Sequence, residues 1–267
     1  MRRLLTFACA GAELGATLDG GGGEVGLVMV TGGSQTRIGS HRMYERLAKA
    51  LAERGISCLR FDRRGVGDSD GDDPGFRGSG LDLAAALACL RSAASGVRRV
   101  HGFGLCDGAT ALALFGGGAG FDGAILVNPW LVEAEAGAPP PAAIHRHYRE
   151  RLLSREGWRK MLSGGVDYRK LFKGLGRIAR RRRASLLADG AVDALARRPL
   201  PIQLVLAERD ATAIAAESEL KASKFRHLLD GAQRIDSDSH TFARPGDEAA
   251  LLDAVIAALA RLEAQAS

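Results

Sequence analysis

The chain has 267 residues, of which 46% are hydrophobic and 25% are charged, an ordinary composition for a globular protein. This length suits one large domain or a domain plus an insertion, and no apolar run approaches the roughly 20 residues that a membrane-spanning helix needs. The net charge of +6 is concentrated in residues 131–199, which hold 16 Lys and Arg against 7 Asp and Glu, so an acidic partner is expected there.

The pattern of the N-terminal residues predicts a β-hairpin and not a targeting signal. Residues 4–10 and 12–18 have the character of two strands that turn at Gly11, whereas a secretory signal would need a clearer apolar core and cleavage site. The four cysteines have neither CxxC nor metal-ligand spacing, which argues against a zinc site and against a disulfide framework. Free thiols suit a reducing compartment, so a cytoplasmic location is expected.

Short apolar runs alternate with helical patterns through most of the chain. The predicted strands are residues 4–10, 12–18, 25–30, 56–61, 97–103, 123–128 and 201–207, with an eighth that begins at Ile235. Between them, Tyr44, Leu47, Ala48 and Leu51 form one stripe on a helix, and a similar stripe in residues 251–262 predicts a closing helix. This alternation predicts an α/β fold with a mostly parallel eight-stranded sheet flanked by helices.

The stretch Gly104-Leu105-Cys106-Asp107-Gly108 has the form Gly-x-nucleophile-x-Gly between a predicted strand and a predicted helix. A sharp strand-to-helix turn needs glycines where a Cβ would obstruct the close approach of helix and strand. The thiol of Cys106 would then stand at the carboxyl edge of the sheet, beside the positive end of a helix that favours a thiolate. The alternative is a small buried hydrophobic residue, which is the commoner fate of a free cysteine.

A candidate acid and a candidate base follow Cys106 in the chain. Asp210 comes shortly after the strand 201–207, and His240 lies in a Ser/Asp-rich loop after the last strand. His240 would take the thiol proton and later protonate the leaving group, while Asp210 would orient the imidazole and stabilise its cation. Each residue also has a structural alternative, because a lone histidine is usually structural and Asp210 could simply cap the following helix.

Other polar residues could replace Asp210 in this role. Asp236 and Asp238 are rival carboxylates near His240, and Asn128 occupies an alternative acid position without a carboxylate.

The Gly-rich stretch Thr31-Gly-Gly-Ser-Gln35 follows an early buried strand. Main-chain N–H groups in such a loop can point at a developing oxyanion. Ser34 is the first candidate donor, Gln35 the second, and Asp107 after the nucleophile would supply the other N–H group. The alternative is an ordinary strand-to-helix turn.

Several of these motifs carry a family resemblance. The Gly-Leu-Cys-Asp-Gly turn, residues 61–71 (FDRRGVGDSDG), the Gly-rich loop and the Asp210/His240 pair resemble an α/β-hydrolase over nearly the whole chain. Residues 32–42 (GGSQTRIGSHR), 127–130 (VNPW) and 152–160 (LLSREGWRK) resemble, more closely, the exosortase A system-associated hydrolase 1 family. That resemblance implies a role in exopolysaccharide production or PEP-CTERM protein sorting. The chain departs from the family at Ser34, where proline is expected.

Residues 131–199 interrupt the alternation, so they are predicted to form an inserted basic helical cap over a core of residues 1–130 and 200–267. Trp130, His145, Tyr148 and Arg180 are candidate substrate-binding residues, and the run Arg180-Arg-Arg-Arg183 would favour an anionic substrate. The alternative for this run is a solvated helix face. Peripheral contact with anionic lipid is a further option, whereas nucleic acid is disfavoured because no binding motif or interleaved aromatic residues accompany the charge.

Together these features predict a hydrolase of small activated esters or thioesters that uses Cys106, His240 and Asp210 through an acyl-enzyme, with no metal and no cofactor. A thiolate is a strong nucleophile but also a good leaving group, so its attack on an unactivated amide tends to collapse backward. Two alternatives are an acyltransferase with the same three residues and a non-catalytic scaffold in a polysaccharide pathway.

Overall fold

A computed structural model describes residues 1–132 and 186–266 of the chain. Eight strands form one sheet: β1 (Arg2–Cys9), β2 (Ala12–Asp19), β3 (Val25–Val30), β4 (Ser57–Phe61), β5 (Arg99–Leu105), β6 (Gly123–Val127), β7 (Ile202–Ala207) and β8 (Gln233–Ile235). The helices are η1 (Ser40–Arg42), α1 (Met43–Ala52), α2 (Gly75–Gly78), α3 (Gly80–Ala93), α4 (Asp107–Ala119), α8 (Leu186–Arg197), α9 (Ala211–Lys221), η2 (Arg226–Leu229) and α10 (Asp247–Ala266).

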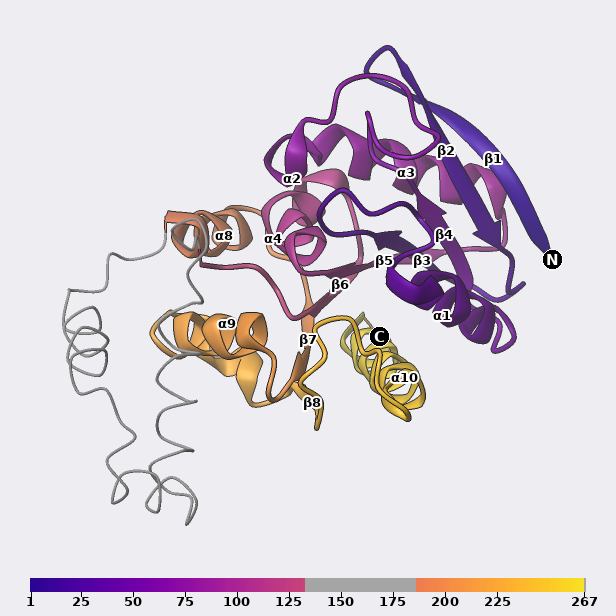
Figure 1. Ribbon diagram of the computed structural model, residues 1–267. Coiled ribbons are helices and arrows are strands. Elements are labelled where there is room, and N and C mark those ends of the chain that lie inside the picture. Colours follow the sequence, from indigo (N-terminus) through magenta and orange to yellow (C-terminus); the bar gives the residue numbers. More distant parts are fainter. Residues whose placement is uncertain (133–185, 267) are drawn as a thin grey trace, which may run out of the picture.

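The strand order in the sheet is β1-β2-β4-β3-β5-β6-β7-β8 (Figure 1). Strands β3 to β8 pair in parallel, while β2 pairs antiparallel with both β1 and β4. This confirms the predicted eight-stranded, mostly parallel sheet. The β1–β2 hairpin turns at Ala10 and Gly11, which both have positive φ (50° and 83°), as a two-residue turn between twisted strands requires.

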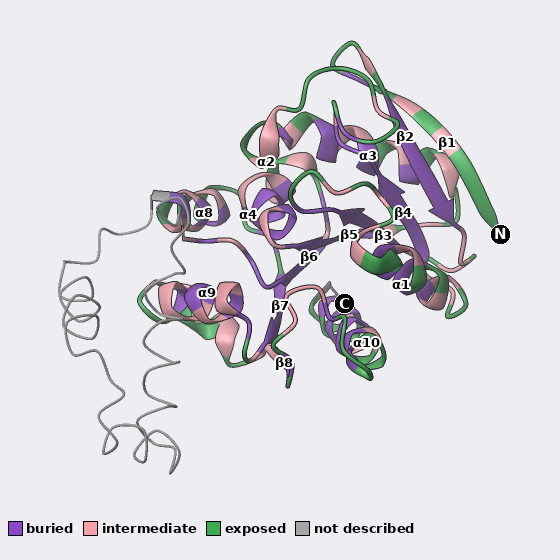
Figure 2. Cartoon of the chain, viewed as in Figure 1, coloured by how far each residue is buried: buried purple, intermediate pink, exposed green. Residues whose placement is uncertain are grey.

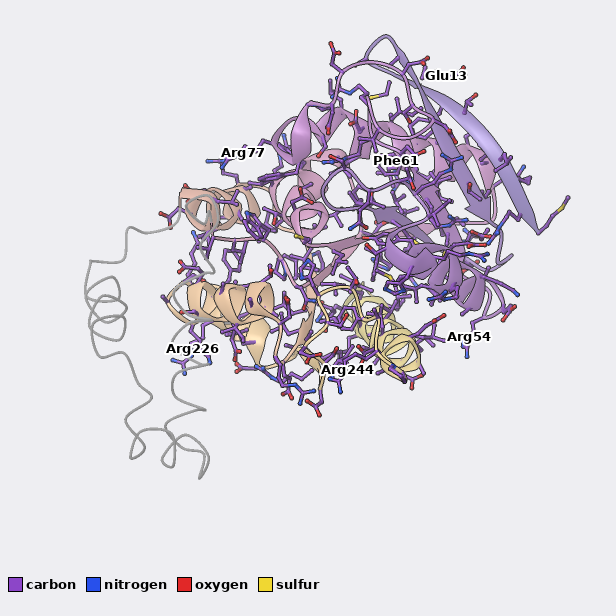
Figure 3. All side chains as sticks on the ribbon, viewed as in Figure 1. Glu13, Arg54, Phe61, Arg77, Arg226 and Arg244 are labelled. Carbon is purple, nitrogen blue, oxygen red and sulfur yellow. The ribbon has the colours of Figure 1, made fainter. Side chains whose placement is uncertain are left out.

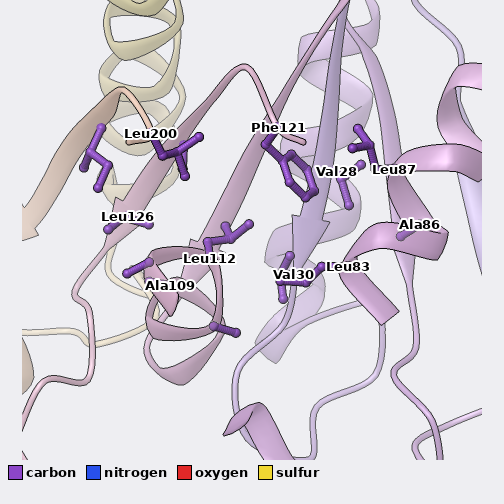
Figure 4. Packing of buried hydrophobic residues seen from close by; sticks show 14 of the residues in the cluster. Val28, Val30, Leu83, Ala86, Leu87, Ala109, Leu112, Phe121, Leu126 and Leu200 are labelled. Carbon is purple, nitrogen blue, oxygen red and sulfur yellow. The ribbon is translucent and has the colours of Figure 1, made fainter. Parts of the chain in front are cut away.

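Helices cover both faces of the sheet and create two apolar layers. Helices α1 and α10 pack on one face through residues such as Leu47, Leu51 and Val255. The other face is covered by α3, α4, α8 and α9, where side chains of Val28, Leu83, Leu112 and Leu126 interlock (Figure 4). Figure 2 shows the central strands as buried and β1 as largely exposed, which is why only the inner strands read as continuous apolar runs.

Most strand boundaries differ from the predicted ones by one or two residues, and the differences at the ends of β5 and β8 have a clear cause. Strand β5 begins at Arg99 and runs to Leu105, because Leu105 still pairs with Val127 of β6. Strand β8 ends at Ile235, where it was predicted to begin, because its pairing with β7 stops at Ala207. Both boundaries are set by the length of the neighbouring strand, which a single run of residues does not reveal.

Charged side chains cover the outside of the molecule. Figure 3 shows Arg54, Arg77, Arg226 and Arg244 at the periphery and Phe61 inside, in agreement with their exposure. No helix within residues 1–132 and 186–266 combines the length and the apolar character needed to cross a bilayer. Of the predicted cap, α8 packs against α4, and residues 133–185 lie outside the described residues.

Candidate active site

Cys106 is the single residue between β5 and α4, and it turns the chain from strand to helix. Its backbone has φ 61° and ψ −124°, a conformation that a side chain with a Cβ rarely adopts. A Cβ added at Gly104 would lie 2.6 Å from the nitrogen of Ala109, and one at Gly108 would lie 2.5 Å from the carbonyl oxygen of Val30. Both glycines are therefore required for the tight turn, and the half-buried Cys106 stands at its tip.

His240 and Asp210 come together at the same edge of the sheet. The Nδ1 atom of His240 lies 3.0 Å from Oδ2 of Asp210, which is only 6% exposed. The same Oδ2 accepts a hydrogen bond of 3.0 Å from the nitrogen of Ala213 and so caps α9. Asp210 therefore caps the helix and also contacts the histidine. The capping hydrogen bond restricts the orientation of its carboxylate.

The charge on His240 depends on Cys106 as well as on Asp210. Burial opposes the charged imidazole, but hydrogen bonds with Asp210 and with Cys106 outweigh it and raise the pKa of His240 to about 10. Because Nδ1 faces Asp210, Nε2 is the ring nitrogen left for the sulfur. The pKa of His240 is thus coupled both to the Asp210 carboxylate and to the Cys106 sulfur.

The rival carboxylates pair elsewhere. Asp236 lies 2.5 Å from the guanidinium of Arg209, and Asp238 lies 3.3 Å from that of Arg244. Both side chains are largely exposed, at 74% and 64%. Asp210 is therefore the carboxylate that orients the imidazole.

The Gly-rich loop after β3 lies directly against the Cys106 turn. A Cβ added at Gly32 would lie 3.1 Å from Cβ of Cys106. The nitrogen of Gly33 donates a hydrogen bond of 2.6 Å to Oδ1 of Asp107, and the carbonyl of Gly33 accepts one from the guanidinium of Arg63. Both polar groups of Gly33 are therefore occupied, and the loop is tied to the start of α4.

The other candidate donors of this loop differ in availability. The Gln35 nitrogen donates to the carbonyl of Gly32 at 3.3 Å, and its side-chain oxygen accepts from the nitrogen of Ser40 at 3.3 Å. Ser34 is exposed. In the part of the chain that the structure describes, the main-chain N–H groups of Ser34 and Asp107 donate to no protein acceptor, so both are free to bind an oxyanion.

Of the four candidate substrate-binding residues, Trp130 is described. It is half-buried, and its nitrogen donates a hydrogen bond of 3.1 Å to the carbonyl of Cys106, so it lies beside the turn. Its own carbonyl accepts a hydrogen bond of 2.7 Å from the hydroxyl of Thr110 on α4. His145, Tyr148, Arg180 and the arginine run 180–183 lie outside the described residues.

Tyr44 supports the site in a way that the sequence did not indicate. Its hydroxyl donates to the carbonyl of Val30 at 2.8 Å and accepts from the nitrogen of Leu105 at 3.2 Å, so it joins the ends of β3 and β5 behind Cys106. The ring is fully buried, and burial raises the pKa of the phenol far above its usual value. From the sequence, Tyr44 was predicted only to lie on the apolar face of a helix.

Comparison with known proteins agrees with the observed fold. GrgF, an alpha/beta hydrolase from Penicillium sp. sh18, is 18% identical with a TM-score of 0.65, and the match covers 99% of both chains. The Pyrococcus furiosus esterase Pf2001 is 13% identical with a TM-score of 0.63, over 96% of this chain and 90% of that one. A thioesterase domain from the curacin biosynthetic pathway is 13% identical with a TM-score of 0.56, over 96% and 99%.

At these identities the three structures establish the fold alone, and no match was found among curated protein sequences. The sequence profile of the alpha/beta hydrolase family, in contrast, matches residues 27–258, most of the chain. The strand order, the turn at Cys106 and this match lead to one conclusion: the chain belongs to the alpha/beta hydrolase family.

Proposed function

We propose that this protein hydrolyses a small activated ester or thioester through an acyl-enzyme on Cys106. The observation that carries the proposal is the position of His240, which contacts Cys106 on one side and Asp210 on the other. Its raised pKa keeps the imidazole protonated at neutral pH, and an adjacent cation stabilises a thiolate. A cationic imidazole is therefore in place beside the nucleophile before the substrate arrives.

In the first half-reaction, the sulfur of Cys106 attacks the acyl carbon and the carbonyl electron pair moves to oxygen. The N–H groups of Ser34 and Asp107 would stabilise this oxyanion, because neither donates to a protein acceptor among the described residues and both belong to the segments that meet at the Cys106 turn. The oxyanion then collapses, the bond to the leaving group breaks, and Nε2 of His240 gives its proton to the departing oxygen or sulfur.

Acylation prepares His240 for the second half-reaction. A thioester sulfur carries no charge and no proton, so the hydrogen bond and charge of Cys106 that raised the pKa of His240 disappear. The pKa of His240 falls as a result, and the imidazole, neutral after it has given up its proton, can take a proton from water as the water attacks the thioester. Asp210 keeps the ring oriented in both steps through its hydrogen bond to Nδ1.

The substrate class follows from the sulfur nucleophile. Because thiolate leaves readily, the tetrahedral intermediate partitions toward products only when the other leaving group is also good, as in thioesters, aryl or enol esters and lactones. The similar structures include an esterase and a thioesterase domain, which supports this range. The positive charge of residues 131–199 favours an anionic substrate. The resemblance to exosortase A system-associated hydrolases suggests a substrate from exopolysaccharide metabolism.

Intact-mass analysis after mixing with p-nitrophenyl acetate or an acyl-CoA tests the proposal. We expect an acyl adduct on Cys106 that forms and decays during turnover, and no adduct in Cys106→Ala. An adduct that persists until a sugar or amine acceptor is added would indicate acyl transfer. Absence of any adduct, with unchanged behaviour of Cys106→Ala, would leave a non-catalytic scaffold.

A further inference from the structure

Asn128 lies at the corner between the two loops that carry Asp210 and His240. It follows the last residue of β6, it is completely buried, and its φ of 41° is one that Asn tolerates better than most residues. Its nitrogen donates a hydrogen bond of 3.0 Å to the carbonyl of Val205 in β7. In the sequence, Asn128 was notable only because it occupies an alternative position for the catalytic acid but has no carboxylate.

The side-chain amide of Asn128 joins both loops. Its Nδ2 donates a hydrogen bond of 3.1 Å to the carbonyl of His240. Its Oδ1 accepts one of 2.8 Å from the nitrogen of Ala207, the last residue of β7. The carbonyl of Ala207 in turn accepts from the nitrogen of Asp210 at 3.1 Å. A single side chain therefore fixes the main chain of His240 relative to the strand end that leads into Asp210.

These contacts require an amide. The side chain must donate to a carbonyl on one side and accept from an N–H group on the other, and a carboxylate has no proton to donate. An aliphatic side chain of the same size would leave both buried backbone groups unpaired. The amide also adds no charge beside the imidazole.

We propose that Asn128 is a positioning residue that sets the main chain of His240, and through it the approach of the imidazole to Cys106. Its catalytic consequence rests on the proposed hydrolase function. Its effect on the reactivity of the Cys106 thiol does not, because alkylation needs no natural substrate.

The substitution Asn128→Asp gives a pH-dependent test. When neutral, the new carboxyl group can still donate to the carbonyl of His240 and accept from Ala207; when ionised, it cannot donate and its charge opposes that carbonyl. Burial favours the neutral form, so we expect Cys106 to react with iodoacetamide at the wild-type rate near about pH 5.5 and about tenfold more slowly near about pH 7.5. Peptide mass analysis separates Cys106 from the other three cysteines.

Two further variants complete the test. Asn128→Gly tolerates the positive φ and removes the amide, so we expect kcat for p-nitrophenyl acetate to fall about 10- to 100-fold at every pH, with KM little changed. Gln203→Glu is the matched control, because it converts another buried amide, four residues before Ala207 in β7, to an acid. It should leave the alkylation profile of Cys106 as in the wild type.

A loss of reactivity in Asn128→Asp that is equal at all pH values, or a profile like that of Gln203→Glu, would overturn the positioning role. If the wild type is alkylated as expected but turns over no ester, the hydrolase proposal fails. The ratio of alkylation rates between Asn128→Asp and the wild type still decides the role of Asn128 in that case.

Discussion

The two sides of the Cys106 turn are held in place by different chemistry. On the side of the Gly-rich loop, charged groups dominate: buried Asp62 accepts from the nitrogen and the guanidinium of Arg37, and Arg37 also lies 2.7 Å from Asp68. On the side of His240, the ion pairs of Asp236 and Asp238 are largely exposed, and the completely buried Asn128 amide binds the main chain of His240.

This difference has a consequence for the imidazole. Across the described residues, the only charged groups that shift the pKa of His240 are Asp210 and Cys106. The ion pairs of Asp236 and Asp238 are exposed to solvent, which screens them, so the change in charge at Cys106 during the reaction acts on the imidazole with little interference. The Gly-rich loop carries no titrating group of the reaction, so buried ion pairs can fix it without such interference.

The largest effect is expected from removing the imidazole on the side of His240. His240→Gln should lower kcat/KM for p-nitrophenyl acetate at least about 1000-fold, because neither proton transfer can then occur. His41→Gln is the matched control: this exposed histidine contacts the carbonyl of Thr241, the neighbour of His240, at 2.8 Å. The control should keep activity within a few-fold. A His240→Gln enzyme with a tenth of wild-type activity would rule out the proposed role.

On the charged side the expected effect is on stability. Asp62→Asn places an NH2 group against the guanidinium of Arg37 and the nitrogen of Asp68, which should cost about 3 kcal/mol in the free energy of unfolding because the pair is buried. Asp68→Asn removes the other carboxylate that binds Arg37, but the Asp68 side chain is 73% exposed. Its cost should be under about 1 kcal/mol. Urea unfolding measures both, and equal costs would contradict the distinction.

The hydroxyl of Tyr44 connects the end of β3, which leads into the Gly-rich loop, to the end of β5, which leads into Cys106. Removing this hydroxyl tests whether the connection is needed. Tyr44→Phe leaves the carbonyl of Val30 and the nitrogen of Leu105 without their shared partner. We expect a loss of about 1–2 kcal/mol in urea unfolding and a smaller loss in kcat than that of Asn128→Gly. An unchanged unfolding midpoint would mean that the two strand ends hold their positions without the hydroxyl.

The smallest effect concerns the pH dependence of stability. Because the folded pKa of His240, about 10, exceeds its ordinary value of 6.5, its protonation stabilises the fold fully below about pH 6.5 and progressively less as pH rises through 10. The free energy of unfolding of the wild type should therefore decline over this window more than that of Cys106→Ala. Parallel curves for the two proteins would contradict the contribution of the sulfur.

The sequence indicates the arrangement of the candidate site where its signals are local. The two glycines around Cys106 are a steric requirement of the turn itself, and Asp210 and His240 each follow a strand in the expected order. Their meeting needs only parallel strands whose carboxyl ends share one edge of the sheet.

The supporting residues were not predictable in the same way. Tyr44 is 61 residues from Leu105, and Asn128 is 112 residues from His240. In both cases the side chain binds backbone groups, which have no side-chain signature in the sequence. The end of β8 was missed for a related reason, because the extent of its partner β7 sets it.

The most direct test of the central claim is the titration of the His240 imidazole by NMR in the wild type and in Cys106→Ala. If sulfur, imidazole and carboxylate act as one unit, the wild-type pKa lies near 10 and falls markedly when the sulfur is removed. Titration of His240 near 6.5 in both proteins would contradict the account, because the imidazole would then be indifferent to Cys106.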